Sequence, residues 1–345
     1  MGFTNQGFRY IKRNGLHLYP LKGMSRADWL RLRGMAGTLG GSDVGSIMGW
    51  NYRFSRIELF YQKIGLNQGS SDGHNEYTYW GSKNEGNIMD TAQYYDFEDP
   101  HSYLHNASYG RKLREISEFR YSVRNPAIPF INANVDGLIG LDRRRFKARR
   151  VAESKTISRQ SAQMWDTIPP YHLGQVLVYL AVLKPMISED VAEIYYLEDG
   201  NKFSAWEIPQ SPILLEQILE QCIAFNEKVQ KGLEIVMNVL EVDKRNRFLQ
   251  EIEPDPDDTK AYEVFLSDLY KQKQNFVKVQ GPTEIYDRAV AYKSINADIK
   301  GLESKAQLEK NYIMKFINDN DASVVDFGDQ GKITYNKRLY VNIKE

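Results

Sequence analysis

Apolar positions recur at helical spacing through the first third of the chain, and serine-initiated caps mark where the helices begin. A serine followed three residues later by an acid, the pattern of a capping box, occurs at Ser25–Asp28 and at Ser55–Glu58. A further helix is predicted to start at the Gly-Gly-Ser-Asp stretch 40–43, and another to cover about residues 82–95. We therefore expect a mainly helical N-terminal region.

Two stretches interrupt this helical pattern. Residues 67–76 are polar and rich in glycine, which is typical of a loop. Residues 96–118 mix proline, histidine, tyrosine and charged side chains, and we expect an irregular insertion there.

The middle of the chain changes to the alternating pattern and β-branched composition of strands. Strands are predicted at residues 119–123, 129–141, 149–158, 191–198 and 202–208. The last two are expected to form a hairpin around Asp199 and Gly200. A strongly apolar helix, residues 171–183, is predicted to follow Pro169-Pro170.

The pattern from residue 211 onwards is again mostly helical. It breaks at Pro254-Asp-Pro256, continues in a long helix over about 282–318, and ends in a predicted β-hairpin with its turn at Gly328–Gly331. Strands bracketed by helices indicate an α/β (α+β) fold with a mixed sheet. We divide it into a core, residues 1–210, and a helical C-terminal extension, residues 211–345.

Composition narrows the class of protein. The chain has 345 residues, 45 basic and 45 acidic side chains, and one cysteine, Cys222. This excludes an internal disulfide framework and a multi-cysteine zinc site. No apolar run approaches membrane-spanning length and no signal-peptide core is present, so we expect a soluble intracellular protein. Cys222 and His172 have no partner at metal-ligand spacing, and we expect His172 to pack and Cys222 to be a core or surface thiol.

The zero net charge argues against a nucleic-acid partner only until its distribution is considered. Residues 1–35 carry seven basic side chains and one acidic one, and residues 143–150 carry six basic and none acidic. Residues 251–268 carry seven acidic side chains against one lysine. Such runs are either solvated surface or, if they share a face, a surface that attracts phosphate.

The most informative chemical pattern is Asp136 followed, after sixteen intervening residues, by Glu153-Ser154-Lys155. Glu153 and Lys155 lie two apart on a predicted strand, so both side chains point to one face. If the strands pair as a hairpin, two carboxylates and an ammonium group converge. Carboxylates are suited to Mg²⁺, and a nearby lysine can orient or deprotonate an attacking water. This is the chemistry of metal-assisted phosphodiester hydrolysis, although an exposed ion pair would give the same spacing.

Three further features support the catalytic interpretation, and each also has a plainer one. Ser42, with Arg33 upstream, could bind a phosphate at a helix N-terminus or simply cap the helix. Glu85, placed one turn into its predicted helix, could supply a third carboxylate or only favour the helix dipole. Gln175 lies in an apolar helix with Tyr179 at i+4, and could serve the site or be a satisfied core glutamine.

Together and in this order, these motifs resemble the YqaJ-type viral recombinase nucleases, relatives of phage lambda exonuclease in the PD-(D/E)XK superfamily. The resemblance covers roughly residues 25–210. Its matching stretches are WLRLRGMAGTLGGSDVGSIMGWN (29–51), SRIELFYQKIG (55–65), WGSKNEG (80–86), NPAIPFINANVDGLIG (125–140), AESKTIS (152–158) and IPPYHLGQVLVYLAVL (168–183).

The resemblance implies a role for each matching residue. Asp136, Glu153, the backbone carbonyl of Ser154, and Glu85 would hold a divalent cation, Mg²⁺ or Mn²⁺. Lys155 would position or activate the water, and Gln175 would lie near the active site. Arg33 and Ser42 would grip a terminal 5′ phosphate. In this context we also expect the basic turn to contact duplex DNA through Arg143, Arg144, Arg145 and Lys147.

The resemblance further implies a restriction-endonuclease-like core and a 5′-to-3′ exonuclease acting on double-stranded DNA. Its 3′ single strand would pass to an annealing protein in phage-type recombination, in the cytoplasm of a bacterial or phage-infected cell. Relatives can form trimers, so a homo-oligomer is possible. Two alternatives stay open: an endonuclease of the same fold acting on duplex or branched DNA, and a non-catalytic DNA-binding module.

Overall fold

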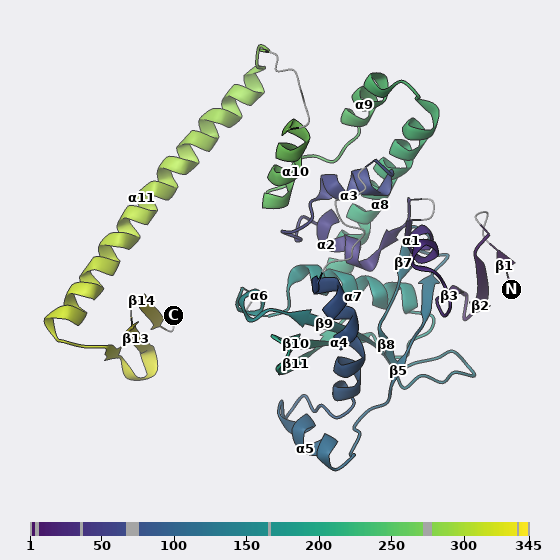
Figure 1. Cartoon of the computed structure of the whole chain (residues 1–345), viewed down its shortest axis with the longest axis horizontal. Helices are drawn as coiled ribbons and strands as arrows, with labels where there is room; N and C mark the ends of the chain where they lie inside the picture. The colour runs from purple at the N-terminus through teal and green to yellow at the C-terminus, as the bar shows by residue number, and fades with distance from the viewer. Residues whose placement is uncertain are drawn as a thin grey trace. The chain divides into compact units, whose positions relative to one another are not determined.

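The computed structural model describes residues 2–3, 7–34, 37–66, 76–164, 167–271, 278–336 and 338–343. The chain forms two compact units, Met1–Gln272 and Lys273–Glu345, and Figure 1 shows the elements of each. The predicted boundary after residue 210 falls at the start of helix α8 (Pro212–Asn238), within the first unit.

Two sheets form the centre of the first unit. The first contains, in spatial order, β1 (Gly2–Phe3), β2 (Arg9–Arg13), β3 (Leu16–Pro20), β6 (Tyr121–Arg124), β7 (Ile131–Ala133) and β4 (Leu39–Gly40). The second contains β11 (Lys202–Pro209), β10 (Val191–Glu198), β9 (Arg150–Ile157), β8 (Gly137–Ile139) and β5 (Ile116–Glu118). Both are mixed, because β4 and β7 pair in parallel, as do β9 and β10.

Helices cover both faces of the second sheet. Helix α4 (Glu76–Ala92) packs beside Ala152 and Tyr195, whereas α7 (Pro170–Leu183) packs beside Val151 and Ile194. Alternate residues of β9 point to opposite faces, so Glu153 shares the α7 face with Val151. The sequence of β9 thereby decides which side chains can meet α7.

The first unit contains several other helices. They are α1 (Arg26–Gly34), η2 (Gly41–Asp43), α2 (Val44–Ile47), α3 (Arg56–Lys63), α5 (Ser102–Ser108), α6 (Arg159–Gln163), α8, α9 (Val242–Gln250) and α10 (Lys260–Lys271). The capping box of Ser55 and Glu58 is confirmed, since the two residues cap α3 reciprocally. At the other predicted box, the hydroxyl of Ser25 accepts from the backbone N–H of Asp28 at 3.1 Å, which makes Ser25 the cap of α1. None of the helices in the described ranges is long and apolar enough to cross a membrane.

Three predicted elements differ from the structure. The single strand expected at 129–141 is interrupted, with β7 in one sheet and β8 in the other. The irregular insertion at 96–118 contains α5 and β5, because Asn106 and Ser102 anchor α5 to the end of α4 through hydrogen bonds. Helix α4 begins at Glu76, so Glu85 lies in its middle, not one turn from its start. The rest of the loop predicted at 67–76 lies outside the described residues.

The second unit is a long helix followed by a small sheet. Helix α11 (Thr283–Asp319) is followed by β12 (Val324–Asp326), the short η3 (Gly328–Gln330), β13 (Gly331–Asn336) and β14 (Arg338–Ile343). The terminal hairpin and its turn are confirmed, and a third strand extends it. Within this unit, Ile317 of α11 and Ile333 of β13 are buried.

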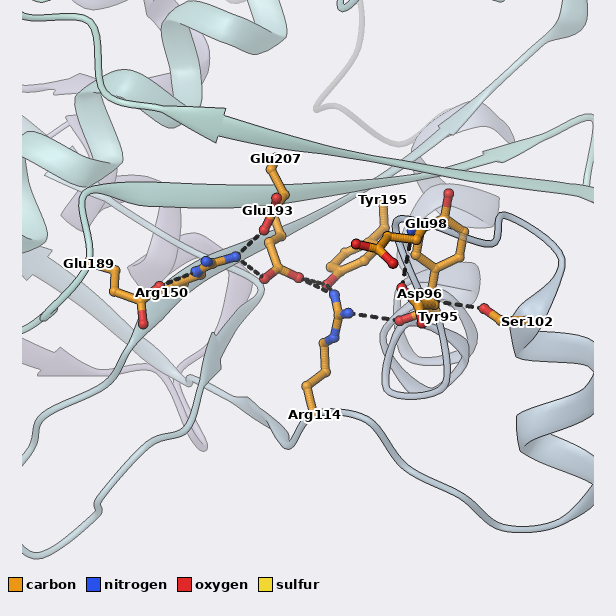
Figure 2. A network of polar contacts seen from close by, with 10 residues as sticks. All are labelled: Tyr95, Asp96, Glu98, Ser102, Arg114, Arg150, Glu189, Glu193, Tyr195 and Glu207. Atoms are coloured by element: carbon orange, nitrogen blue, oxygen red, sulfur yellow. Dashed lines mark hydrogen bonds and ion pairs between the residues drawn. The ribbon is translucent and has the colours of Figure 1, made fainter.

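A buried ionic network holds the α4 face of the second sheet (Figure 2). Glu193 on β10 accepts hydrogen bonds from Arg114 at 2.5 Å, from Arg150 on β9 at 2.9 Å, and from the Tyr195 hydroxyl. Arg114 also donates to the backbone carbonyl of Tyr95 at 2.8 Å, just after α4. The network therefore ties α4 and the segment before β5 to the strands that carry the candidate site.

Candidate active site

Asp136 lies in the bend between the two sheets, immediately before β8. The predicted hairpin is confirmed, because β8 pairs antiparallel with β9 and places Gly137 opposite Ala152. Oδ2 of Asp136 accepts from the backbone N–H of Ser154 at 2.9 Å and from its hydroxyl at 2.8 Å. These two bonds fix the Asp136 carboxylate beside β9.

Glu153, Lys155 and Gln175 converge on the α7 face of β9. Oε1 of Glu153 accepts from Lys155 Nζ and from Gln175 Nε2, both at 2.7 Å. Gln175 Nε2 also donates to the Tyr179 hydroxyl at 3.0 Å, one turn along α7. The structure thus gives the buried glutamine two polar partners, one of them a candidate catalytic carboxylate.

The other oxygen of Glu153 has a different environment. Glu153 is buried, and its Oε2 has no hydrogen-bond partner. Burial and the Asp136 carboxylate raise the pKa of Glu153 to about 8. A buried carboxylate oxygen without a partner costs free energy unless a proton or cation compensates it.

Glu85 contributes a third negative group from α4. Burial, followed by the charges of Asp136 and Glu118, raises the pKa of Glu85 to about 7. Burial alone would lower the pKa of Lys155, but Glu153 and Asp136 outweigh it and raise that pKa. These mutual effects show that the three carboxylates and the lysine share one electrostatic environment.

The donor chemistry fits a hard divalent cation. Carboxylate oxygens are the ligands that Mg²⁺ and Mn²⁺ take, and the unpartnered Oε2 of Glu153 is a position where a cation would remove an energetic cost. Across the ranges that the structure describes, no three His, Cys, Asp or Glu side chains already form a closed metal cluster. Asp136 and Glu153 would hold the cation, with Glu85 and the Ser154 carbonyl as the further predicted ligands.

Arg33 and Ser42 come together as predicted. Arg33 Nη2 donates to Ser42 Oγ at 2.8 Å, although the two residues belong to α1 and η2. The Arg33 guanidinium also lies over the Trp29 ring, 4.7 Å from its centroid. Ser42 is exposed. This pair presents a cation and a hydroxyl that a terminal phosphate could engage.

The loop that carries Ser42 packs against Tyr179. A Cβ at Gly41 would lie 2.3 Å from Tyr179 Cε1, so only glycine fits there. On the other side of the loop, Asp43 accepts from Gly40 N at 2.7 Å and pairs with Lys63 at 2.6 Å. Tyr179 therefore touches both the Arg33/Ser42 loop and Gln175, which makes the phosphate pair and the carboxylate cluster neighbours.

Comparison with known proteins finds one matching family. The family model of the YqaJ-like viral recombinase domain matches residues 28–185, a range that includes every candidate site residue. This part of the chain is therefore similar to a YqaJ-like viral recombinase domain. No curated protein matches the sequence significantly.

Solved structures similar to the chain include nucleases. An alkaline exonuclease from Laribacter hongkongensis is 15% identical, with a TM-score of 0.45 over 64% of this chain and 99% of that one. A phage related exonuclease from Haemophilus somnus is 12% identical, with a TM-score of 0.37 over 58% and 96% of the two chains.

The basic turn, residues 143–150, lies at the far end of β8 and β9 from Asp136. Lys147 donates to the backbone carbonyl of Pro185 at 2.6 Å, beyond the C-terminal end of α7. Arg145 stays largely exposed, and Arg143 and Arg144 are exposed as well. The two remaining arginines of the run, Arg149 and Arg150, both pair with Glu189. Contact of this turn with DNA remains a prediction.

Two features near the candidate site were not predicted. Burial lowers the pKa of His172, and the charges of Lys155 and Arg53 act in the same direction. His172 packs as expected, with Nδ1 3.0 Å from the Tyr196 hydroxyl. The Asp43–Lys63 pair joins residues twenty apart, and no local motif signals it. Cys222 is fully buried in the core, which settles its predicted alternatives.

Proposed function

We propose that this protein is a metal-dependent deoxyribonuclease of phage-type recombination, acting as a 5′-to-3′ exonuclease on double-stranded DNA. One observation carries the proposal: Glu153 meets Lys155 and Gln175 through one oxygen while its other oxygen is buried without a partner. Asp136 is held beside them by Ser154. Structural ion pairs do not need a second, unpartnered carboxylate oxygen, whereas a cation site does.

The chain's own groups divide the work of hydrolysis. A bound Mg²⁺ or Mn²⁺ supplies a more acidic water and neutralises charge on the phosphate. Asp136 and Glu153 would hold that cation, and Glu85 would add negative charge from α4. Lys155 keeps its proton beside Glu153, so it can orient the attacking water and offset charge that develops on the phosphodiester. Gln175 holds the Glu153 carboxylate in position.

End selection follows from the Arg33/Ser42 pair. A guanidinium and a hydroxyl bind a terminal phosphate dianion better than an internal monoanionic diester. Because Tyr179 links this loop to Gln175, a bound end would lie close to the scissile bond. We further propose that the basic turn contacts the duplex. The same proposal has three further parts. The 3′ strand is delivered to an annealing protein, the protein forms a homo-oligomer, and it acts in the cytoplasm.

Incubation with linear and covalently closed circular duplexes tests the activity. With Mg²⁺ or Mn²⁺ we expect the linear duplex to be degraded, the closed circle to stay intact, and EDTA to abolish the reaction. Release of labelled mononucleotides from either end measures polarity. Cleavage of the closed circle would instead favour an endonuclease, and binding without cleavage at any metal concentration would favour a non-catalytic module.

The Arg33→Gln variant tests the phosphate pair. We expect it to lose about 10- to 100-fold in rate on 5′-phosphorylated ends, since a charge-assisted hydrogen bond is removed, and to change little on 5′-hydroxyl ends. The two rates are measured on duplexes of identical sequence that differ only in carrying a 5′ phosphate or a 5′ hydroxyl. Arg31→Gln, an exposed arginine on the same helix, is the matched control and should keep the preference. Equal losses on both ends would contradict the assignment.

A further inference from the structure

A cavity lies at the end of β10 and the start of β11, and residues of α6 contribute to its lining. Figure 1 shows where these three elements lie. The volume of the cavity is about 500 Å³, within the range of small-ligand sites. Six polar or aromatic side chains give it its character: Arg159, Tyr196, Glu198, Lys202, Ser204 and Trp206. None of them belongs to the carboxylate cluster.

Strand register places the β11 residues of this cavity two strands from the catalytic groups, and its β10 residues one strand from them. Lys155 on β9 lies opposite Tyr196 on β10, which lies opposite Ser204 on β11. In the same way, Glu153 shares a row with Trp206. Neighbouring strands are about 4.8 Å apart, so the β11 side chains stand roughly 10 Å from the cluster. A DNA strand with its scissile phosphate at Glu153 and Lys155 could reach the cavity with an adjacent nucleotide.

The charges are arranged from the floor of the cavity to its rim. Glu198 is buried and pairs with Lys202 at 3.0 Å. The cations are at the rim, where the side chains of Lys202 and Arg159 are 63% and 61% exposed. The Trp206 residue is 40% exposed and offers ring surface to the cavity. This layout favours an uncharged aromatic group inside and a phosphate outside.

We propose that this cavity binds one unpaired nucleotide of the DNA strand, with the base stacked on Trp206 and its phosphate beside Lys202 and Arg159. The inference rests on the proposed nuclease function and adds a strand-holding subsite to it. Stacking on an aromatic ring is available only to a base that has left the duplex. Glu198 and Ser204 can accept hydrogen bonds from base amino groups at the floor. The subsite would therefore hold the strand open next to the point of cleavage.

Binding of a fluorescein-labelled single-stranded pentathymidylate to the full chain in EDTA tests the subsite without cleavage. We expect Trp206→Ala to weaken binding by about five- to a hundredfold, the effect of losing one stacked base, and Trp206→Phe to retain most of it. Lys202→Ala and Arg159→Ala should each weaken the salt dependence of binding. The slope of log Kd against log salt concentration should fall by about 0.7 for each variant. Tyr109→Ala, which removes an exposed aromatic ring elsewhere, and Lys184→Ala, which removes an exposed lysine, are the matched controls.

The outcomes separate this inference from the proposed function. If the wild type degrades linear duplex and Trp206→Ala, folded by circular dichroism, binds the oligonucleotide as the wild type does, the subsite is wrong and the nuclease stands. If the wild type shows no cleavage with either metal, the nuclease proposal fails independently of binding. Thymidine monophosphate competing as strongly as the pentamer would overturn the strand assignment and indicate a site for free nucleotide.

Discussion

Replacing Lys155 with alanine is expected to lower the rate of DNA hydrolysis by about 10²- to 10⁴-fold, the contribution of a positioned proton-transfer or charge-stabilising group. Lys155 Nζ lies 2.7 Å from Glu153 Oε1 and is only partly exposed, so its charge is held beside the candidate catalytic carboxylate. The fold should survive the loss of the lysine. Gln175 still donates to Glu153, and the Glu153 carboxylate can take up a proton once the Lys155 ammonium group is gone.

The measurement is the initial rate of nucleotide release from linear duplex at saturating Mg²⁺, with thermal unfolding recorded on the same samples. Lys155→Arg keeps the charge but changes the geometry, and we expect it to stay close to the alanine variant. Lys184→Ala, an exposed lysine paired with Asp190, serves as the control and should be fully active. Undiminished hydrolysis by Lys155→Ala, together with indifference to EDTA, would disprove the catalytic assignment.

Local sequence signals predicted much of the helical framework. Capping boxes at Ser25 and Ser55 marked helix starts because the groups that satisfy the first N–H donors lie three residues apart in sequence. The placement of Asp136 beside the strand that carries Glu153 also followed from local information. Strands that follow one another in sequence often pair antiparallel, and alternation then fixes which side chains share a face.

Features that depend on distant packing were not predictable in this way. The break of residues 129–141 into β7 and β8 arises because each half pairs with a different sheet, and no residue in the stretch signals it. Gly41 reads as an ordinary loop glycine until Tyr179, more than a hundred residues away, is placed against it. The cavity beside β11 likewise requires the order of β9, β10 and β11, which sequence alone leaves open.

The ionic network of Figure 2 also depends on packing between distant segments, so the sequence did not predict it. Breaking this network is the change with the largest expected effect on stability. Its members lie at Arg114, Arg150, Glu193 and Tyr195, in three separate elements of sequence. Glu193 lies at the centre, buried, whereas Glu207 pairs with Arg150 at the edge with its side chain 43% exposed. The two glutamates sit opposite each other on β10 and β11 and differ mainly in burial.

Glu193→Ala is therefore expected to lower the free energy of unfolding of the first unit by about 3–5 kcal/mol, because it leaves two half-buried arginines without the buried carboxylate that they share. Glu207→Ala removes a partner of the same Arg150 at the surface and should cost about 0–1 kcal/mol. Urea unfolding followed by tryptophan fluorescence measures both, since all five tryptophans lie between residues 29 and 206. Glu193→Gln keeps the shape and an acceptor, so its loss should fall between the two. Equal costs for Glu193→Ala and Glu207→Ala would mean that the network does not hold β9 and β10 in place, and the position of Glu153 and Lys155 would then depend on α7 alone.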